Sequence, residues 1–470
     1  MFFKAKHVHF VGIGGIGMSG IAEILLNLGY RISGSDLKLS PVTARLAGLG
    51  ARVWEGHAAE QVGDADAVVI SSAVQASNPE VEEALRRQIP VIPRGELLAE
   101  LMRLKYGIAV AGSHGKTTTT SMTAAVLSHA QLDPTIVVGG RVAGFGSNAR
   151  LGRSDFLVVE ADESDRSFLN LAPILAIVTN IDREHLDCYA SLEDLQDAFV
   201  EFVNKVPFYG AVVLALDDPP TRAILPRIRR RVLTYGTTAG ADLVPSAVEC
   251  GHLTSKFQAH LRGRHLGEFH LRCAGQHNVL NSLAAVLIGL ELEIPIDTIR
   301  QGLAEFSGVD RRFQLRGSQA GVTVIDDYGH HPTEIRATLA AARNCNFRRV
   351  HVLFQPHRYT RTYHLLPEFA ACFKDSDALY LLDIYAAGEK PIEGINSTVL
   401  ARRIREAGHP CVRHFATLEE AITAIERATA PGDLVMTLGA GSVWQAGDKL
   451  LAMLAASKPA PEPAPAVREG

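Results

Sequence analysis

A glycine-containing segment, Ala111–Thr120, constrains the fold of this chain more than any other part of the sequence. It follows the apolar run Tyr106–Val110, which predicts a buried strand, and precedes Ser121–Leu127, which predicts the start of a helix. A turn between a strand and a helix gathers backbone N–H groups at a helix N-terminus, where the helix dipole favours phosphate. The segment therefore predicts a nucleotide-triphosphate loop within an α/β fold.

Two side chains of this loop suit the same chemistry. Lys116 would add a positive charge near the β- and γ-phosphates, and Thr117 would supply a hydroxyl ligand for Mg²⁺. The full pattern G-x-x-x-x-G-K-S/T is not met, because Val110 stands where its first glycine belongs. This departure indicates a subclass rather than a generic ATPase. The structural alternative is an ordinary strand-to-helix turn with a solvated lysine.

Predicted strands and helices alternate in three blocks along the chain, which predicts three α/β domains, each built on a mostly parallel, doubly wound sheet. We expect a Rossmann-like domain over 1–106, a P-loop ATPase-like domain over 107–311 and a second Rossmann-like domain over 312–456. The predicted strands outside the phosphate loop are Val8–Val11, Arg31–Ser35, Ala67–Ile70, Pro90–Pro93, Phe156–Glu160, Leu175–Asn180, Ala211–Leu214, Val322–Ile325, Arg349–Phe354, Ala378–Leu382 and Asp433–Thr437. The stretch 231–271 predicts an antiparallel appendage, and the Pro/Ala-rich tail 457–470 predicts disorder.

Composition limits the partners of the protein. The 470 residues include 47 basic and 51 acidic side chains and carry a formal net charge of −4, which predicts neither a nucleic-acid nor a membrane partner. The six cysteines are scattered and predict reduced thiols, not a zinc site or a disulfide framework. Neither a cleavable leader nor a membrane-spanning window is seen in the sequence. We therefore expect a cytoplasmic protein whose partners are small molecules or other proteins.

A second glycine loop follows the first predicted strand. Gly12, Gly14 and Gly17 satisfy G-x-G-x-x-G, with Gly15 between them, and Asp36 ends the next strand. The pattern fits a dinucleotide, with its pyrophosphate at the helix N-terminus and the acid on ribose hydroxyls. Another pyrophosphate-bearing ligand, such as a nucleotide sugar, would satisfy the same backbone geometry. The structural alternative is a tight turn for helix–strand packing.

Acidic residues gather after the strand that ends at Glu160. The run Glu160–Asp165 holds four carboxylates, and its expected place beside the phosphate loop favours Mg²⁺ over a solvated acidic loop. Glu160, nearest the strand end, is the preferred ligand, whereas Asp162, Glu163 and Asp165 could orient substrate or face water.

Two further polar clusters are expected near the loop. The segment Thr179–Asp187 brings His185 together with Asn180, Asp182 and Asp187, which suggests a second metal or phosphate site. His277 and Asn278 open a predicted helix, where they could be caps or contacts to a base edge. The sequence leaves these two alternatives open.

The third block carries polar residues after two of its strands. These are Asp326–Pro332, with His330, and Gln355–Arg361, with His357. Carboxylates, imidazoles and arginines at the ends of parallel strands are typical of a polar ligand site in an α/β domain. The adjacent histidines 330 and 331 lack the spacing of a zinc site.

Taken together, these motifs closely resemble those of the Mur ligase family. The resemblance covers all three blocks and omits only the tail. It rests on Val11–Gly20, Gly112–Thr118, Glu160–Asp165, Thr179–Asp182, Asp327–Pro332 and Gln355–Arg361. The shorter phosphate loop of that family accounts for the missing glycine. Ser113 replaces the more usual threonine and keeps the hydroxyl. The carbamylated lysine of sister ligases has no counterpart, because Asp197–Phe199 contains no lysine.

The resemblance implies an amide-forming reaction that consumes ATP in peptidoglycan precursor synthesis. The lactyl carboxylate of UDP-N-acetylmuramate would attack the γ-phosphate to give an acyl phosphate, which the amine of L-alanine would then attack, releasing phosphate. The implied cofactors are ATP and two Mg²⁺ ions, for which Mn²⁺ can substitute. The implied partners are these small-molecule substrates, and the protein would be a monomer or a homodimer.

The same resemblance implies the site residues. The catalytic residues would be Lys116, Glu160 and His185, and the metal ligands Thr117, Glu160 and His185. ATP would contact Gly112, Ser113, His114, Gly115, Lys116, Thr117, Thr118, His277, Asn278, Arg311 and Asp326. The other substrates would contact Gly12, Gly14, Gly15, Gly17, Asp36, Ser71, Asp165, His330, His357, Arg358 and Arg361.

Three other functions fit parts of the sequence. An NAD-dependent oxidoreductase would use the first glycine loop but would leave the phosphate loop without a role. A P-loop switch protein would bind nucleotide without amine-dependent turnover. A peptide-recycling ligase of the same family would join a tripeptide to the same sugar nucleotide, a choice that depends on pocket volume in the third domain.

Overall fold

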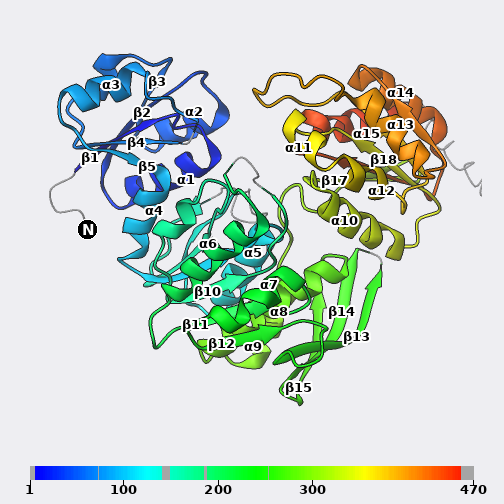
Figure 1. Cartoon of the computed structure of the whole chain (residues 1–470), viewed down its shortest axis with the longest axis horizontal. Helices are drawn as coiled ribbons and strands as arrows, with labels where there is room; N and C mark the ends of the chain where they lie inside the picture. The colour runs from blue at the N-terminus through cyan, green and yellow to red at the C-terminus, as the bar shows by residue number, and fades with distance from the viewer. Residues whose placement is uncertain (1–5, 72, 140–148, 185–187, 252, 457–470) are drawn as a thin grey trace, which may run out of the picture. The chain divides into compact units, whose positions relative to one another are not determined.

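The computed structural model describes residues 6–71, 73–139, 149–184, 188–251 and 253–456, and these residues form three β-sheets flanked by helices (Figure 1). The chain divides into two compact units. The first comprises Met1–Glu249, Ser255–Arg272 and His277–Asp310, and the second comprises Cys250–Thr254, Cys273–Gln276 and Arg311–Gly470. The predicted α/β class with mostly parallel sheets is confirmed. The exact domain boundaries remain a prediction. Among the described residues, no helix is long and apolar enough to span a membrane.

The N-terminal sheet of the first unit is entirely parallel, in the order β3-β2-β1-β4-β5. Its strands are β1 (His7–Val11), β2 (Arg31–Asp36), β3 (Arg52–Glu55), β4 (Ala67–Ile70) and β5 (Val91–Pro93). Its helices are α1 (Ile16–Asn27), α2 (Pro41–Gly48), η1 (Ala59–Val62), α3 (Pro79–Arg86) and α4 (Arg94–Met102). The strand order reverses beside β1, and ligands of such sheets bind at this switch point. The glycine loop between β1 and α1 lies there.

The second sheet of this unit has ten strands in the order β15-β14-β13-β12-β11-β10-β6-β9-β7-β8. They are β6 (Tyr106–Ala111), β7 (Thr135–Val137), β8 (Ala149–Arg150), β9 (Phe156–Glu160), β10 (Leu175–Val178), β11 (Ala211–Ala215), β12 (Val232–Tyr235), β13 (Leu243–Gly251), β14 (Thr254–Leu261) and β15 (Arg264–Leu271). β6 lies between β9 and β10, so residues that follow these three parallel strands share one sheet edge. The antiparallel appendage predicted over 231–271 is confirmed for β14 and β15, which pair antiparallel, whereas β12 pairs parallel with β11 and the whole stretch extends this sheet.

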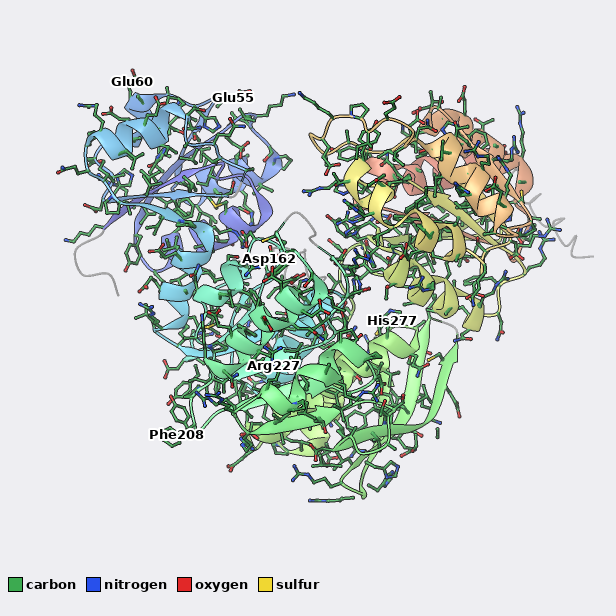
Figure 2. The ribbon with its side chains drawn as sticks, in the orientation of Figure 1. Glu55, Glu60, Asp162, Phe208, Arg227 and His277 are labelled. Atoms are coloured by element: carbon green, nitrogen blue, oxygen red, sulfur yellow. The ribbon has the colours of Figure 1, made fainter. Side chains whose placement is uncertain are left out.

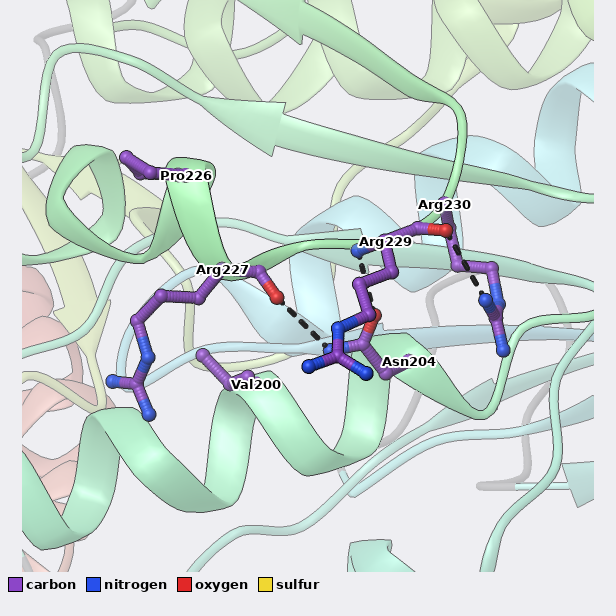
Figure 3. A pocket seen from close by; sticks show the side chains of 6 residues that line it. All are labelled: Val200, Asn204, Pro226, Arg227, Arg229 and Arg230. Atoms are coloured by element: carbon purple, nitrogen blue, oxygen red, sulfur yellow. Dashed lines mark hydrogen bonds between the residues drawn. The ribbon is translucent and has the colours of Figure 1, made fainter.

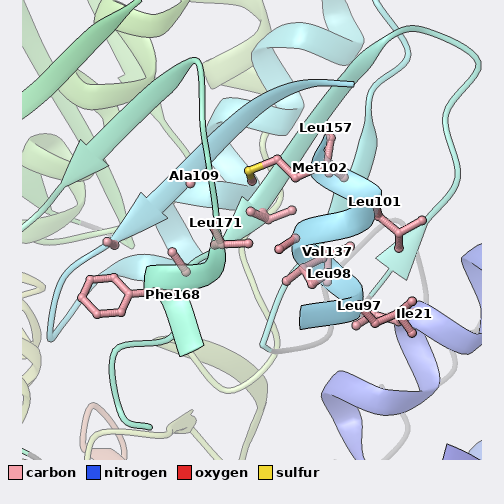
Figure 4. Close-up of a cluster of buried hydrophobic side chains, with 14 of the residues drawn as sticks. Ile21, Leu97, Leu98, Leu101, Met102, Ala109, Val137, Leu157, Phe168 and Leu171 are labelled. Atoms are coloured by element: carbon pink, nitrogen blue, oxygen red, sulfur yellow. The ribbon is translucent and has the colours of Figure 1, made fainter. Parts of the chain in front are cut away.

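The helices of the second sheet are α5 (Lys116–His129), η2 (Ser167–Asn170), α6 (Leu192–Asn204), α7 (Pro219–Ile224), η3 (Leu225–Arg227), α8 (Gln276–Glu291) and α9 (Ile296–Glu305). Local sequence starts several of them. Ser191 caps α6 by accepting a hydrogen bond from Asp194 N, and Asp218 caps α7 in the same way. A continuous core runs from α1 and α4 to the strands of this sheet, with Ile21, Leu97 and Leu157 among its buried side chains (Figure 4).

The sheet of the second unit has the order β16-β17-β21-β18-β19-β20, with apolar clusters on it. Its strands are β16 (Gln314–Gln319), β17 (Val322–Asp327), β18 (Val350–Phe354), β19 (Ala378–Leu381), β20 (Val412–His414) and β21 (Leu434–Leu438). Its helices are α10 (Pro332–Asn344), α11 (Tyr359–His364), α12 (Leu366–Ala371), α13 (Ser397–Glu406), α14 (Leu418–Ala428), η4 (Ser442–Trp444) and α15 (Gln445–Ala456). The sequence did not predict β16 and β20, which are short or polar edge strands without an apolar run.

Candidate active site

The phosphate loop turns sharply between β6 and α5 at two glycines with positive φ. Gly112 has φ +134°, and a Cβ atom there would lie 2.0 Å from Thr179 Oγ1. Gly115 has φ +81°, and a Cβ atom there would lie 2.7 Å from Asn281 Oδ1. Both positions therefore require glycine, for the backbone conformation and for the close approach of neighbouring segments.

The segment that follows β10 holds this loop. Asn180 Oδ1 accepts a hydrogen bond from His114 N at 2.8 Å, and Asn180 Nδ2 donates to His114 O at 3.0 Å. His114 Nε2 lies 2.9 Å from Asp182 Oδ2, and Asp182 N donates to Ser113 Oγ at 2.8 Å. The sequence suggested a metal or phosphate site for Asn180 and Asp182. In the structure both residues fix the shape of the phosphate loop, and their role toward a metal or phosphate stays a prediction.

Lys116 is folded back over the loop and held by oxygen atoms. Its Nζ donates to Gly112 O at 2.6 Å, to Ser113 O at 3.2 Å and to Glu163 Oε1 at 2.9 Å. Burial by itself would lower the pKa of Lys116, but the carboxylates of Glu163, Asp162 and Glu160 raise it well above its ordinary value. Lys116 is therefore charged at neutral pH, as a phosphate-binding lysine must be.

Glu163 is the functional residue that sequence reasoning left undecided. Its side chain is fully buried, and Tyr189 Oη donates to its backbone oxygen at 2.6 Å. A buried ammonium group needs a carboxylate nearby, because an unpaired buried charge is strongly destabilising. Applied to the sequence, this requirement would have pointed to a carboxylate of the acidic run after β9 as the partner of Lys116, and Glu163 is that carboxylate.

Thr117 and Glu160 form the candidate metal site. Thr117 Oγ1 donates to Glu160 at 2.9 and 3.1 Å, and Gly139 N donates to Glu160 Oε2 at 2.6 Å. A hydroxyl and a carboxylate converging beside a phosphate loop are the hard oxygen donors that Mg²⁺ takes, so these residues fit the ion. His185, the third predicted ligand, lies outside the described residues.

The other carboxylates of the acidic run have local partners. Asp165 Oδ1 accepts from Ser167 N at 2.9 Å at the start of η2, so its predicted contact to substrate remains a prediction. Asp162, labelled in Figure 2, accepts from Ser164 N with its Oδ1 at 3.0 Å, and its Oδ2 lies 3.5 Å from Arg94 Nη2.

The N-terminal part of α8 lies against the phosphate loop. Asn281 is the residue whose side chain approaches Gly115, and Asn281 Nδ2 donates to Asn278 Oδ1 at 3.5 Å. Asn278 is buried and His277, labelled in Figure 2, is half-buried, and both lie within the helix rather than before it. They are therefore not caps in the strict sense, and their place near the loop is compatible with contacts to a nucleotide.

The glycine loop of the first sheet is tied to β2. Gly12 N and Ile13 N donate to Ser35 O at 2.8 and 2.9 Å, and Gly14 N donates to Asp36 Oδ2 at 2.8 Å. Asp36 thus holds the loop with one carboxylate oxygen, a role that the sequence did not indicate. Ser71, after β4, lies beside Gly12, since a Cβ atom on that glycine would be 3.8 Å from Ser71 Oγ.

Predicted residues of the second unit gather where its parallel strands end. Arg311 Nε donates to Asp326 Oδ2 at 3.0 Å, and Arg311 Nη2 donates to Gly439 O at 2.5 Å. The neighbouring Asp327 is buried and accepts from Phe313 N and Gly329 N, both at 2.7 Å. Burial raises the pKa of Asp327 to about 6, against the opposing effect of these bonds and of a nearby guanidinium.

Aromatic rings line the same edge of this sheet. The ring of His357 lies 5.9 Å from that of His330 and stacks at 5.6 Å on that of Tyr385. Burial, His330 and the two arginines that follow lower the pKa of His357 to about 3, so its imidazole is neutral near pH 7. Arg361 Nη1 lies 3.3 Å from His357 Nδ1, and Arg358 N donates to Tyr385 O at 2.8 Å. The strand ends thus bring together a neutral imidazole and two guanidinium groups.

A separate basic pocket lies elsewhere in the first unit. Arg227, Arg229 and Arg230 line a cavity of about 520 Å³ together with Asn204 (Figure 3). These residues precede β12 or end α6, so they lie at the strand edge opposite the phosphate loop. This pocket is therefore not part of the candidate active site.

The fold and the two phosphate-binding turns define an α/β nucleotide-binding protein. The chain matches the Mur ligase family, catalytic domain, over residues 7–106, the Mur ligase middle domain over 110–289, and the Mur ligase, glutamate ligase domain, over 311–441. The chain belongs to the Mur ligase family, whose members are ATP-dependent ligases.

Relatives that match the chain over nearly its full length show which members of the family it is highly similar to in sequence. The chain is 64% identical to a UDP-N-acetylmuramate–L-alanine ligase of Solibacter usitatus, covering 97% of this chain and 96% of the relative. It is 60% identical to the enzyme of the same name from Koribacter versatilis, covering 98% and 100%. The crystal structure of UDP-N-acetylmuramate-alanine ligase from Thermotoga maritima superposes with a TM-score of 0.81 at 28% identity, covering 96% of this chain and all of that one.

Proposed function

We propose that this protein joins L-alanine to the lactyl carboxylate of UDP-N-acetylmuramate, with hydrolysis of ATP to ADP and phosphate. The observation that carries the proposal is the presence of two phosphate-binding turns in one compact unit, after β1 and after β6. One turn suits the diphosphate of a sugar nucleotide and the other a triphosphate. The names of the full-length relatives support this choice of substrates.

The residues of the phosphate loop would activate the carboxylate. The backbone N–H groups of Gly112 to Lys116 bind the phosphates, and Lys116 stabilises the charge that develops as the γ-phosphoryl group moves to the carboxylate. Glu163 keeps Lys116 charged and directed at the loop. The product is an acyl phosphate, whose phosphate is a far better leaving group than the original oxygen.

Thr117 and Glu160 would hold Mg²⁺, with His185 as a further ligand for one of two ions. When bound, the metal neutralises phosphate charge and orients the γ-phosphoryl group. The present contact between Thr117 and Glu160 keeps both oxygen donors at one place beside α5. Mn²⁺ is expected to substitute, because it also prefers oxygen ligands.

The second unit would supply the amino-acid contacts. Arg358 and Arg361 can bind a carboxylate bidentately, and the neutral imidazole of His357, with His330 beside it, can accept a hydrogen bond from an amine. Arg311 and Asp326 would contact the nucleotide. The amine of L-alanine would attack the acyl phosphate, and exclusion of water by closure of the site would prevent wasteful hydrolysis.

The remaining expectations belong to the same proposal. We place the domain boundaries near residues 106 and 311, and the protein in the cytoplasm, where ATP and UDP-sugars are available. A monomer or a homodimer is expected, which light scattering would distinguish.

Phosphate release with UDP-N-acetylmuramate and ATP tests the proposal when the amine is varied among L-alanine, glycine, L-serine and the tripeptide. We expect release to depend on an amine, with L-alanine giving the highest kcat/KM. Preference for the tripeptide would indicate the peptide-recycling ligase, and release without amine dependence would exclude a ligase. Tight binding of NAD⁺ in place of the sugar nucleotide would support the oxidoreductase.

A further inference from the structure

Arg94, the first residue of α4, lies directly over the glycine loop of the N-terminal sheet. A Cβ atom on Gly17 would lie 2.9 Å from Arg94 Nη1 and 3.0 Å from Arg94 Cδ. The third glycine of G-x-G-x-x-G therefore leaves the space that the Arg94 side chain occupies, and a larger residue there would displace that side chain. Arg94 is not among the site residues that the sequence predicted.

The guanidinium group of Arg94 is poorly satisfied by the described residues. Within the described part of the chain it forms an ion pair with Asp162 Oδ2 at 3.5 Å, which is long for a hydrogen bond. A guanidinium group offers five N–H donors in a planar fork, and the Arg94 side chain is only 22% exposed. Most of these donors are thus available to an anion beside Gly17.

The backbone of Arg94 is fixed by packing on both sides. Leu97, Leu98 and Leu101 of α4 are buried, and Figure 4 shows Leu97 beside Ile21 of α1. On the other side, a Cβ atom on Gly95 would lie 2.6 Å from Ser167 Cβ. The start of α4 therefore stays in place while the long side chain of Arg94 can turn.

We propose that Arg94 binds the diphosphate of the sugar nucleotide and that Asp162 holds Arg94 while no diphosphate is bound. This inference rests on the proposed function and adds one residue to it. The α1 helix begins with Gly15 as its N-cap and has no side-chain cap, so a diphosphate would meet backbone donors from α1 and the guanidinium fork from above.

Asp162 also lies close to Lys116 of the phosphate loop, so the Arg94–Asp162 pair connects the two glycine turns. Asp162 stands between two cations, because its Oδ2 lies 3.5 Å from Arg94 Nη2 and its carboxylate also interacts electrostatically with Lys116. When Arg94 turns to a diphosphate, Asp162 loses one of them. Occupancy of the sugar-nucleotide loop is thereby linked to the charge around Lys116.

The test is calorimetric titration of the full-length protein with uridine, UMP and UDP, with the phosphate loop saturated by a non-hydrolysable ATP analogue and Mg²⁺. R94A should weaken UDP binding about 10- to 100-fold, as expected for loss of charge-assisted hydrogen bonds, and leave uridine binding unchanged. The UDP affinity of R94K should fall between those of the wild type and R94A, because a lysine keeps the charge but lacks the planar fork. R103A is the matched control, since Arg103 immediately follows the same helix and pairs with Glu100.

Asp162 provides the second arm of the test. D162N should tighten UDP binding several-fold by releasing Arg94, and this gain should vanish in R94A/D162N. An equal loss of uridine and UDP affinity in R94A would show a purely structural role and overturn the proposal. A gain that persists in the double variant would show simple charge repulsion and overturn the role of Asp162. If the wild type binds neither UDP nor UDP-N-acetylmuramate, the proposed function itself fails.

Discussion

At the scale of single residues, the candidate site depends on a buried ion pair. Lys116 and Glu163 lie 2.8 Å apart, and Glu163 has no exposure to solvent. The pair places a permanent positive charge inside the loop without requiring a ligand to stabilise it. Asn180 likewise needs no ligand to hold the backbone of the loop, because its side-chain amide forms hydrogen bonds with both His114 N and His114 O. The loop is thus shaped before a nucleotide arrives, which reduces the entropic cost of binding.

Lys116→Ala should abolish turnover, with kcat/KM lowered by about a thousandfold or more, since it removes the charge that stabilises phosphoryl transfer. Binding of UDP-N-acetylmuramate should be nearly unchanged, because the glycine loop after β1 is intact. Phosphate release and calorimetry measure the two effects. Lys449→Ala, at an exposed ion pair with Glu419, is the control. Retained turnover in Lys116→Ala would refute the assigned role.

At the scale of elements, the strand ends position the chemistry. β6, β9 and β10 are neighbours, so the phosphate loop, Glu160 and Asn180 emerge at one edge of the sheet. In the second unit, β17 carries Asp326 and Asp327 to the equivalent edge. Asp327 is buried there to tie the segments before β16 and after β17. Because Asp327 is buried, its titration should make the free energy of unfolding depend on pH.

Asp327 should make the second unit less stable as pH rises. Its pKa is raised to about 6 in the folded protein from an ordinary value of 3.8, so between these values the folded state binds more protons than the unfolded state. Stability contributed by this group is therefore fully present below about pH 4 and is lost as pH rises through about 6, by about 3 kcal/mol. Urea denaturation at several pH values measures the free energy of unfolding of the wild type and of D327N. The difference between the two free energies should change over this pH window and stay constant above it. D375N is the control variant. A difference between wild type and D327N that stays constant from about pH 4 to about pH 6 would contradict the raised pKa of Asp327.

At the scale of the whole molecule, two different phosphate-binding turns share the first unit, and the polar edge of the third sheet lies in the second. A ligase that activates one substrate and transfers it to another needs separate sites for sugar nucleotide, ATP and amine. In the proposed function, each of these sites would use one sheet edge. The three family matches follow the same division.

The two turns can be separated by glycine substitutions. Gly14→Ala places a methyl group 2.8 Å from Asp36 Oδ2 and should remove the thermal stabilisation by UDP-N-acetylmuramate but not that by an ATP analogue. Gly112→Ala should do the reverse, because its Cβ atom would overlap Thr179 Oγ1. Gly48→Ala, at the end of α2 with nothing within 4 Å, should keep both shifts. Loss of both shifts in either loop variant would mean general unfolding.

The sequence by itself determined the α/β class, the two glycine turns and the family, because a strand, a turn and a helix N-terminus are encoded within about twenty neighbouring residues. It could not assign Glu163, Asn180 or Arg94. Lys116 and Glu163 are 47 positions apart, and His114 and Asn180 are 66 apart, so their pairing depends on which strands lie side by side. Only the tertiary structure decided that order. It therefore decided which carboxylate serves the lysine, which amide shapes the loop and which arginine covers the glycine.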